Sequence, residues 1–172
     1  GFDGGVRAFA NVCRHRGSPL VDAGPGHVAR SLRCTFHGWV YDLDGTNVAM
    51  PHSTGGFDGL PASCTSLVER PAAEAHGFVF ARAVGDDPVD AVALLGPAGP
   101  ELASFGFDAF HRFDTDVSEW AANWKLLVDT FLETYHVPAL HPTTVGRHFL
   151  ARPSTCAALG PNILFHSLMR SI

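Results

Sequence analysis

The chain has 172 residues, a formal net charge of −5, and 46% hydrophobic against 17% charged residues. This length suits one ordinary domain or two small ones, and this balance favours a packed core over disorder. No run of Lys or Arg is present to bind nucleic acid, and no apolar stretch is long enough to span a bilayer. We therefore expect a cytoplasmic protein without nucleic-acid or membrane partners. The sequence starts without Met and carries no secretory leader, which indicates an internal fragment of a longer chain.

The first half of the chain indicates an all-β unit. A hairpin is predicted over residues 40–50, because Asp44-Gly45 favours a turn with positive φ. Short segments with apolar residues between polar ones predict strands over 5–13, 27–34 and 77–84.

The second half begins after residues 85–100, which are rich in Pro and Gly and predict a linker. A strand is expected over about 109–119. A helix should follow over 123–136, with Asn123 as its cap and Pro138 ending it. Its apolar face recurs at helical spacing, at Trp124, Leu127, Val128, Phe131 and Tyr135. We expect Trp120 and Trp124 to lie in the core.

The four cysteines are placed unevenly. Cys13 and Cys34 lie close to histidines, whereas Cys64 and Cys156 stand alone. This placement favours a metal site over a pair of disulfides. Cys64 and Cys156 are expected to be buried free thiols, as unpaired cysteines usually are.

The first candidate metal site reads Cys13-x-His15, eighteen intervening residues, then Cys34-x-x-His37. Each pair is predicted in a loop at a strand end, where a sharp turn can direct two side chains to one point. Two thiolates and two imidazoles suit either one zinc ion or a [2Fe–2S] cluster, and the spacing leaves both open.

The second candidate site involves the predicted helix. Asp129, Glu133 and His136 lie at i, i+4 and i+7, on one stripe, for which a solvated polar face is the ordinary interpretation. His141 follows His136 by five residues, across Pro138. A break in the helix there would allow both imidazoles to reach one metal ion.

The segments around both sites resemble one protein family. The stretches CRHRGSPL and CTFHGWVYDLDG resemble the Rieske domain of ring-hydroxylating and related oxygenases, and NWKLLVDTFLETYHVPALHP resembles the mononuclear-iron segment of their α subunits. The resemblance implies an α+β fold. It comprises an all-β Rieske [2Fe–2S] domain over 1–84, a linker over 85–100, and the truncated start of a helix-grip-like catalytic domain over 101–172.

The resemblance also implies a role for each candidate residue. Cys13 and Cys34 would bind one iron of the [2Fe–2S] cluster, and His15 and His37 the other. His136 and His141 would bind a mononuclear Fe(II), whose third ligand in the family is an Asp far downstream.

Two carboxylates of the same segment receive catalytic roles from the resemblance. Glu133 matches the carboxylate that links an iron-bound histidine, here His136, to a Rieske histidine of a neighbouring subunit, here His37. Asp129 would orient the iron site or its water. Many family members carry Asp where this chain has Glu133, which weakens the inference of an aromatic-hydrocarbon substrate.

The flanks of the cluster motif suggest its redox behaviour. Ser18 and Phe36 stand where high-potential Rieske proteins have a disulfide, and no hydrogen bond from a Ser or Tyr partner is evident from the sequence. A lower-potential cluster is therefore expected. Trp39 should pack beside the cluster. The remaining histidines are assigned to surface or loop: His27, His52, His76, His111, His148 and His166.

The implied function is that of a terminal oxygenase component. Electrons from NAD(P)H would arrive through a ferredoxin or flavin reductase, and the Fe(II) would activate O2 to oxygenate a small organic substrate, aromatic hydrocarbons included. The implied assembly is a head-to-tail homotrimer or α3β3, and the fragment is expected to be inactive alone. The alternatives are a Rieske ferredoxin-like electron carrier or, within the enzyme class, a monooxygenase or demethylase of quaternary ammonium compounds.

Overall fold

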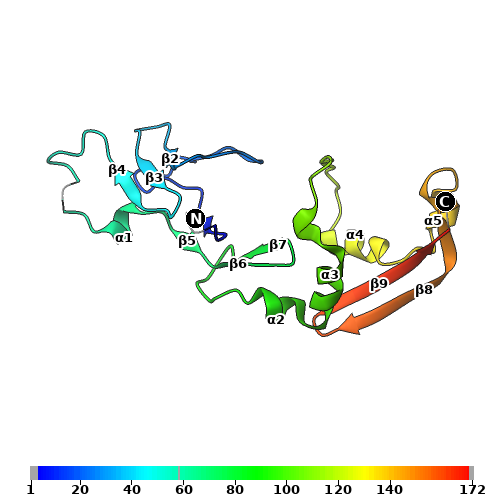
Figure 1. Ribbon diagram of the computed structural model, residues 1–172. Helices are drawn as coiled ribbons and strands as arrows, with labels where there is room; N and C mark the ends of the chain where they lie inside the picture. The colour runs from blue at the N-terminus through cyan, green and yellow to red at the C-terminus, as the bar shows by residue number, and fades with distance from the viewer. Residues whose placement is uncertain (1–3, 58, 171–172) are drawn as a thin grey trace. The chain divides into compact units, whose positions relative to one another are not determined.

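The computed structural model describes residues 4–57 and 59–170, arranged as two compact units, Gly1–Ala91 and Val92–Ile172. Residues 1–3 and 58 of the predicted first domain, and 171–172 of the predicted second, lie outside the described residues. The units combine antiparallel sheets with helices, which confirms the predicted α+β class (Figure 1). Among the described residues, no helix has both the length and the apolar character needed to cross a membrane.

The first unit is built from short antiparallel strands. Strands β2 (Ser31–Arg33), β3 (Val40–Asp42) and β4 (Asn47–Ala49) form one sheet in that order. The remaining elements are β1 (Ala8–Phe9) paired with β5 (Glu69–Arg70), the hairpin of β6 (Ala72–Ala75) and β7 (Phe78–Ala81), and the short helix α1 (Ala62–Thr65).

The predicted hairpin over residues 40–50 is confirmed. Asp42 Oδ1 accepts hydrogen bonds from the backbone N–H groups of Asp44 at 3.0 Å and Thr46 at 2.8 Å, so its carboxylate holds the turn together. Gly45 has φ +80°, and a Cβ there would stand 2.5 Å from a ring carbon of Phe9. Both the backbone conformation and the close packing therefore require glycine at this position.

The core of the first unit surrounds the predicted cluster cysteines. Cys13, Cys34, Trp39 and Tyr41 are buried together, with Leu20 and Leu67 completing the cluster. Burying a large apolar side chain stabilises a fold by about 2–3 kcal/mol, so these residues hold the two cysteine loops against the sheet. The regular strands are shorter than predicted over 5–13, 27–34 and 77–84, because turns and loops occupy much of these segments.

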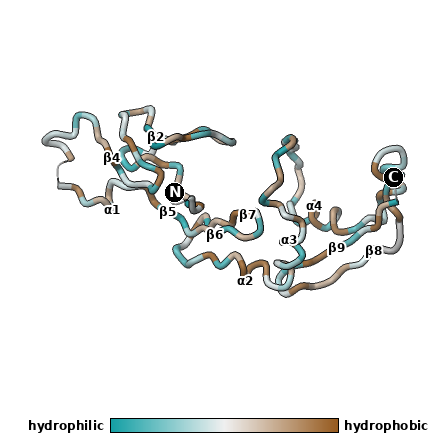
Figure 2. Tube along the Cα trace, in the orientation of Figure 1, coloured by the Kyte–Doolittle hydropathy of each residue, from teal (hydrophilic) through white to brown (hydrophobic). Residues whose placement is uncertain are grey.

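The second unit contains most of the helices. Its elements are α2 (Ala91–Leu95), η1 (Gly96–Ala98), α3 (Gly99–Phe105), η2 (Phe107–Ala109), α4 (Trp124–Phe131), α5 (Val137–Leu140) and η3 (Val145–Arg147), followed by the antiparallel hairpin of β8 (Phe149–Leu159) and β9 (Asn162–Met169). Polar and apolar residues are interspersed along the hairpin, as Figure 2 shows. Residues 91–100 of the predicted linker are largely helical, and no strand is formed over 109–119.

The predicted helix over 123–136 is only partly formed. Asn123 caps α4 as expected, its side-chain oxygen accepting a hydrogen bond from Lys125 N at 3.0 Å. However, α4 ends at Phe131, and Pro138 lies in the first turn of α5 instead of ending the preceding helix. The first turn tolerates proline because its N–H groups have no partner within the helix, so the prediction for Pro138 was wrong.

Several burial predictions were also wrong. Trp120, in the segment before α4, and Trp124, at the start of α4, are 68% and 66% exposed, because the described residues do not cover them. Cys64 and Cys156 are exposed as well, since α1 is a single surface turn and the β8–β9 pair has only two strands.

Candidate functional site

The two predicted cluster loops have the same backbone hydrogen-bond pattern. In each loop the glycine four residues after the cysteine donates its N–H to the cysteine carbonyl, at 2.9 Å for Gly17 and 3.0 Å for Gly38. Each cysteine N–H in turn donates to the carbonyl five residues on, at 2.8 Å for both. Gly17 and Gly38 have φ +75°, a conformation that glycine adopts without strain. The sequence thus forms one turn twice, with a cysteine at the start of each.

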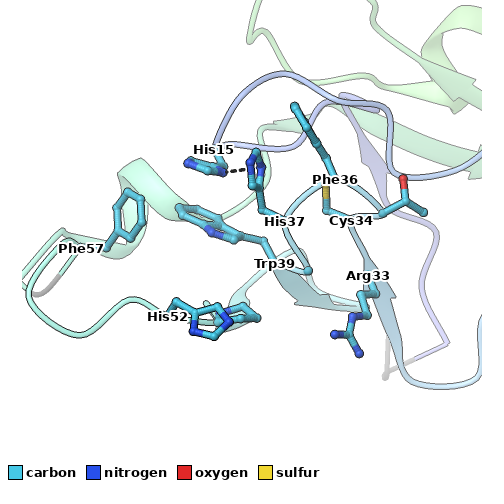
Figure 3. Close-up of a pocket in the computed structure, with 11 residues that line it drawn as sticks. His15, Arg33, Cys34, Phe36, His37, Trp39, His52 and Phe57 are labelled. Atoms are coloured by element: carbon cyan, nitrogen blue, oxygen red, sulfur yellow. Dashed lines mark hydrogen bonds between the residues drawn. The ribbon is translucent and has the colours of Figure 1, made fainter.

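These loops bring the four predicted ligands together in two pairs. The thiols of Cys13 and Cys34 lie in one buried cluster, and the Cys13 side chain lowers the pKa of the Cys34 thiol. The ring nitrogens Nδ1 of His15 and His37 lie 3.1 Å apart (Figure 3). Among the described residues, no three His, Cys, Asp or Glu side chains converge on one point. A donor set of one thiol pair and one imidazole pair fits the [2Fe–2S] cluster, in which each iron takes two protein ligands.

The pKa of the Cys34 thiol reflects this environment. Burial alone raises it, but hydrogen bonds from the backbone N–H groups of Phe36 and His37 and from the side chains of Cys13 and Ser18 outweigh burial, so the net pKa is below its ordinary value. The pKa of His15 is lowered by burial, by His37 and by Arg16. Both shifts favour the deprotonated forms that bind metal.

Tyr41 corrects one expectation from the sequence. Its ring is fully buried, and its hydroxyl lies 3.2 Å from Cys13 Sγ and accepts a hydrogen bond from Arg14 N at 3.0 Å. Burial and the bond to Cys13 raise its pKa, so the hydroxyl keeps its proton and can donate it to the sulfur. The Ser18 side chain also lowers the pKa of Cys34, so both a Tyr and a Ser group act on the cysteine pair. The sequence predicted a low reduction potential partly because these Ser and Tyr partners were not evident. With both present, the prediction loses this argument.

Aromatic rings cover one side of the histidine pair. Trp39 stacks on His15, with ring centroids 5.1 Å apart and planes inclined by 8°, and Phe57 packs edge-on against both rings. The predicted packing of Trp39 beside this site is confirmed. An open pocket of about 840 Å³ adjoins these rings (Figure 3) and is also lined by Arg33 and His52, which sequence reasoning did not place at the site.

The second site centres on His136 and His141, whose ring centroids are 5.7 Å apart. Oε1 of Glu133 is hydrogen-bonded to His136 Nδ1, and its Oε2 accepts from the N–H groups of Tyr135 at 2.5 Å and His136 at 3.2 Å. The hydrogen bond to His136, with smaller contributions from these N–H groups, lowers the pKa of Glu133. With Nδ1 occupied, Nε2 of His136 is the nitrogen left for a metal, as in other metal sites where a carboxylate orients a histidine.

His141 is held by the loop that follows it. It caps α5, and its carbonyl accepts a hydrogen bond from Gly146 N at 2.9 Å. A Cβ on Gly146 would stand 2.5 Å from that carbonyl oxygen and 2.9 Å from the carbonyl oxygen of Val137. Only glycine fits there, and no spacing motif in the sequence marked Gly146 as part of the site.

Asp129 is not brought to the histidine pair. It is exposed on α4, and its side chain makes no hydrogen bond or ion pair with another described residue. Its predicted orienting role therefore has no contact in the described chain to support it.

A pocket of about 750 Å³ opens beside His136 and His141. Its wall is mostly apolar and aromatic, from Trp120, Leu127, Phe131, Phe149 and Phe165. Thr134 and Ser167 add hydroxyl groups, which lie 3.5 Å apart. Such a pocket can hold a small, largely apolar molecule against a metal bound by the histidines.

Two protein families match the chain, one at each site. Residues 2–64 match the Rieske [2Fe-2S] domain, and residues 107–166 match the catalytic domain of the ring hydroxylating alpha subunit. The first match contains Cys13, His15, Cys34 and His37, and the second contains His136 and His141.

Individual proteins similar to this chain are oxygenase subunits, in agreement with both family matches. The chain is 34% identical to the carnitine monooxygenase oxygenase subunit of Acinetobacter pittii, over 83% of this chain and 38% of that protein. It is 42% identical to the large oxygenase component of the 2,4-dinitrotoluene dioxygenase system of Burkholderia sp., over 81% and 32%. A crystal structure of a quaternary ammonium Rieske monooxygenase, 26% identical, superimposes with a TM-score of 0.87 over 99% of this chain and 47% of that one. The chain thus spans less than half the length of each of these relatives.

Proposed function

We propose, on the premise that the chain belongs to the family of Rieske oxygenase large subunits, that the whole protein is the terminal oxygenase component of a multi-component oxygenase. In this proposal Cys13 and Cys34 hold one iron of a [2Fe–2S] cluster, and His15 and His37 hold the other. His136 and His141 supply two ligands of a mononuclear Fe(II). The observation that carries the proposal is the separate pairing of buried thiols and of imidazoles in one half of the chain, with a carboxylate-oriented histidine pair in the other.

The domain assignment is part of the proposal. The Rieske domain would cover residues 1–84, a connecting segment 85–100, and the beginning of the catalytic domain 101–172. The matched ranges, 2–64 and 107–166, fall inside the two proposed domains.

The chemistry divides between the two sites. When bound, a cluster held by the cysteine and histidine pairs would supply electron storage, and an iron held by His136 and His141 would supply oxygen activation. The chain's own residues position the two histidine ligands. Glu133 fixes the ring of His136 through Nδ1, and the loop around Gly146 holds His141. The apolar wall of Phe131, Phe149 and Phe165 holds a substrate near the histidines and keeps water away from them.

Electrons would enter at the cluster from a ferredoxin or a flavin reductase that draws on NAD(P)H, and would leave towards the mononuclear iron. Glu133 is the proposed link between the two centres, joining His136 of one subunit to His37 of its neighbour. One solved relative is described as showing inter-subunit electron transfer, which supports this route and a ring of subunits, as a homotrimer or with β subunits.

A first prediction tests this link in the full-length protein. Glu133→Ala should leave both metals bound when the protein is loaded with excess Fe(II), because Glu133 is not a proposed ligand and only orients His136. Reoxidation of the reduced cluster by O2 and substrate in a single turnover should fall at least tenfold. Rapid-mixing EPR of the cluster signal measures this rate, and unchanged reoxidation would rule out the role of Glu133.

Iron counting separates an oxygenase from the alternative of a Rieske ferredoxin-like carrier. An oxygenase binds one iron more than the cluster's pair, whereas a carrier holds the cluster alone. The match of residues 107–166 to an oxygenase catalytic domain and the close approach of His136 and His141 favour the oxygenase.

For the substrate, we infer a quaternary ammonium compound that undergoes monooxygenation. The supporting observation is the superposition on structures of a quaternary ammonium monooxygenase, with TM-scores from 0.71 to 0.87, against 0.60 to 0.63 for naphthalene dioxygenases. Aromatic rings such as Trp120 and Phe165 at the pocket also suit a cationic ammonium group. Oxygen uptake with L-carnitine, γ-butyrobetaine and glycine betaine tests the inference.

Aromatic-ring dioxygenation is the second candidate. It is favoured by the 42% identity to a dinitrotoluene dioxygenase component and by the apolar pocket wall. Formation of a cis-diol from naphthalene, without turnover of the ammonium compounds, would select it.

A further inference from the structure

Arg33 is an exposed cation at the edge of the cluster loops. Its guanidinium packs over Gly38, with Nη2 3.3 Å from the point where a Cβ would stand, and it lines the pocket shared with His15 and His37 (Figure 3). No hydrogen bond or ion pair joins its side chain to another described residue. By contrast, Arg70 lies 3.2 Å from Asp86.

The two cluster loops around Arg33 also carry positive charge. Residues 13–18 and 33–38, which form the two loops, include Arg14 and Arg16 and contain no Asp or Glu, although the whole chain has a net charge of −5. The face around the histidine pair is therefore locally positive and suits a partner with a local negative charge.

Asp129 is the corresponding anion of the second unit. It is exposed on α4 and has no hydrogen-bonded or ionic partner among the described residues. It lies four residues before Glu133, just as Arg33 lies four residues before His37. Each proposed electron-transfer residue thus has a nearby charge in the sequence that finds no ionic partner among the described residues, and the two charges are opposite.

We propose that Arg33 of one copy of the chain pairs with Asp129 of a second copy, beside the contact between His37 and Glu133. The inference rests on the proposed function, which brings these two residues together between subunits. A partner that offers both the Glu133 carboxylate and a free carboxylate four residues away is this chain itself. The pair adds a second point of contact, which fixes how the two copies are aligned when they dock. It also ensures that neither charge is buried in the interface without an opposite charge beside it.

Charge reversal in the full-length protein tests the pair. Arg33→Glu and Asp129→Arg should each slow single-turnover reoxidation of the cluster about tenfold and weaken subunit assembly measured by sedimentation. The double variant should return both quantities to within about threefold of the wild type, because the pair is restored with its charges exchanged. The matched controls are Arg30→Glu and Asp116→Arg, which reverse exposed charges elsewhere in the same units and should change neither.

Iron and sulfide contents show whether Arg33→Glu, next to Cys34, has disturbed the cluster. If it has, a second cycle uses the neutral variants Arg33→Gln and Asp129→Asn, and the double neutral variant should lose no more than either single one, because either change alone already removes the pair. Added salt screens the wild-type ion pair and so weakens assembly. Each neutral variant lacks this pair, so its assembly should depend less on the salt concentration.

Three results would overturn the inference. The single variants could behave like the controls, or the double variant could show the summed loss of both. Arg33→Glu could also slow only the reduction of the cluster by its reductase, which would assign this face to the electron donor. A wild type that never reoxidises its cluster would instead refute the proposed function, and the sedimentation cycle would still decide whether the charges pair.

Discussion

Tyr41 shows how much one hydroxyl group can determine at the cluster loops. Because this hydroxyl accepts a hydrogen bond from Arg14 N, its own proton is directed to Cys13 Sγ. A hydrogen bond to a ligand sulfur stabilises the reduced cluster, which carries more negative charge than the oxidised one. Tyr41 is therefore expected to raise the reduction potential of a cluster bound here.

The variant Tyr41→Phe, which removes only the hydroxyl group, tests its effect on the reduction potential of the cluster. A hydrogen bond contributing about 1 kcal/mol corresponds to roughly 40 mV for a one-electron couple, so the midpoint potential should fall by roughly that amount. An EPR-monitored redox titration of the full-length protein gives the value. Tyr135→Phe changes the other tyrosine, which is 81% exposed, and should leave the potential unaltered. Equal potentials for wild type and Tyr41→Phe would contradict the role of the hydroxyl.

At the scale of elements, the turn after α5 decides where His141 points. Gly146→Ala places a methyl group against the backbone oxygens of His141 and Val137, neither of which can move aside as a side chain could. The full-length variant should keep its cluster but lose the mononuclear iron, with a stability loss of about 1–3 kcal/mol. Iron and sulfide assays and thermal unfolding measure these effects. Gly26→Ala is the control, because a Cβ at Gly26 meets nothing within 4 Å, and an iron content equal to that of this control would refute the steric argument.

The same elements show what the sequence could and could not predict. The hairpin around Asp44-Gly45 and the Asn123 cap depend on neighbouring residues, and both were predicted correctly. The end of α4 was missed, because Pro138 is compatible with a helix start as well as a helix end. The Tyr41–Cys13 contact was missed because it joins residues 28 positions apart, and no local pattern reports such a distance.

Burial was the least predictable property. Trp120, Trp124 and Cys156 are apolar side chains that usually lie inside a fold, yet the described chain leaves them exposed. Their burial depends on which elements cover α4 and the β8–β9 hairpin, and local composition does not determine that covering.

At the scale of the whole molecule, each proposed metal site lies within one compact unit. All four proposed cluster ligands, Tyr41 and the buried residues around them belong to Gly1–Ala91. We therefore predict that residues 1–91 alone take up a [2Fe–2S] cluster on anaerobic reconstitution, with an EPR signal after reduction. Cys34→Ser in the same piece should abolish it, and a wild-type piece that remains colourless would show that the cluster loops need the rest of the chain.

The face-to-face stacking of Trp39 on His15 makes the indole a built-in optical reporter. The chain has three tryptophans, and Trp39 is the one within residues 1–91, so emission from that piece comes from a single fluorophore 3% exposed. The ring of Trp39 lies against a proposed iron ligand. Binding of the strongly absorbing cluster should therefore quench the fluorescence of Trp39, and release of the cluster should restore it. The loading of this protein could then be followed in real time by fluorescence, without a label.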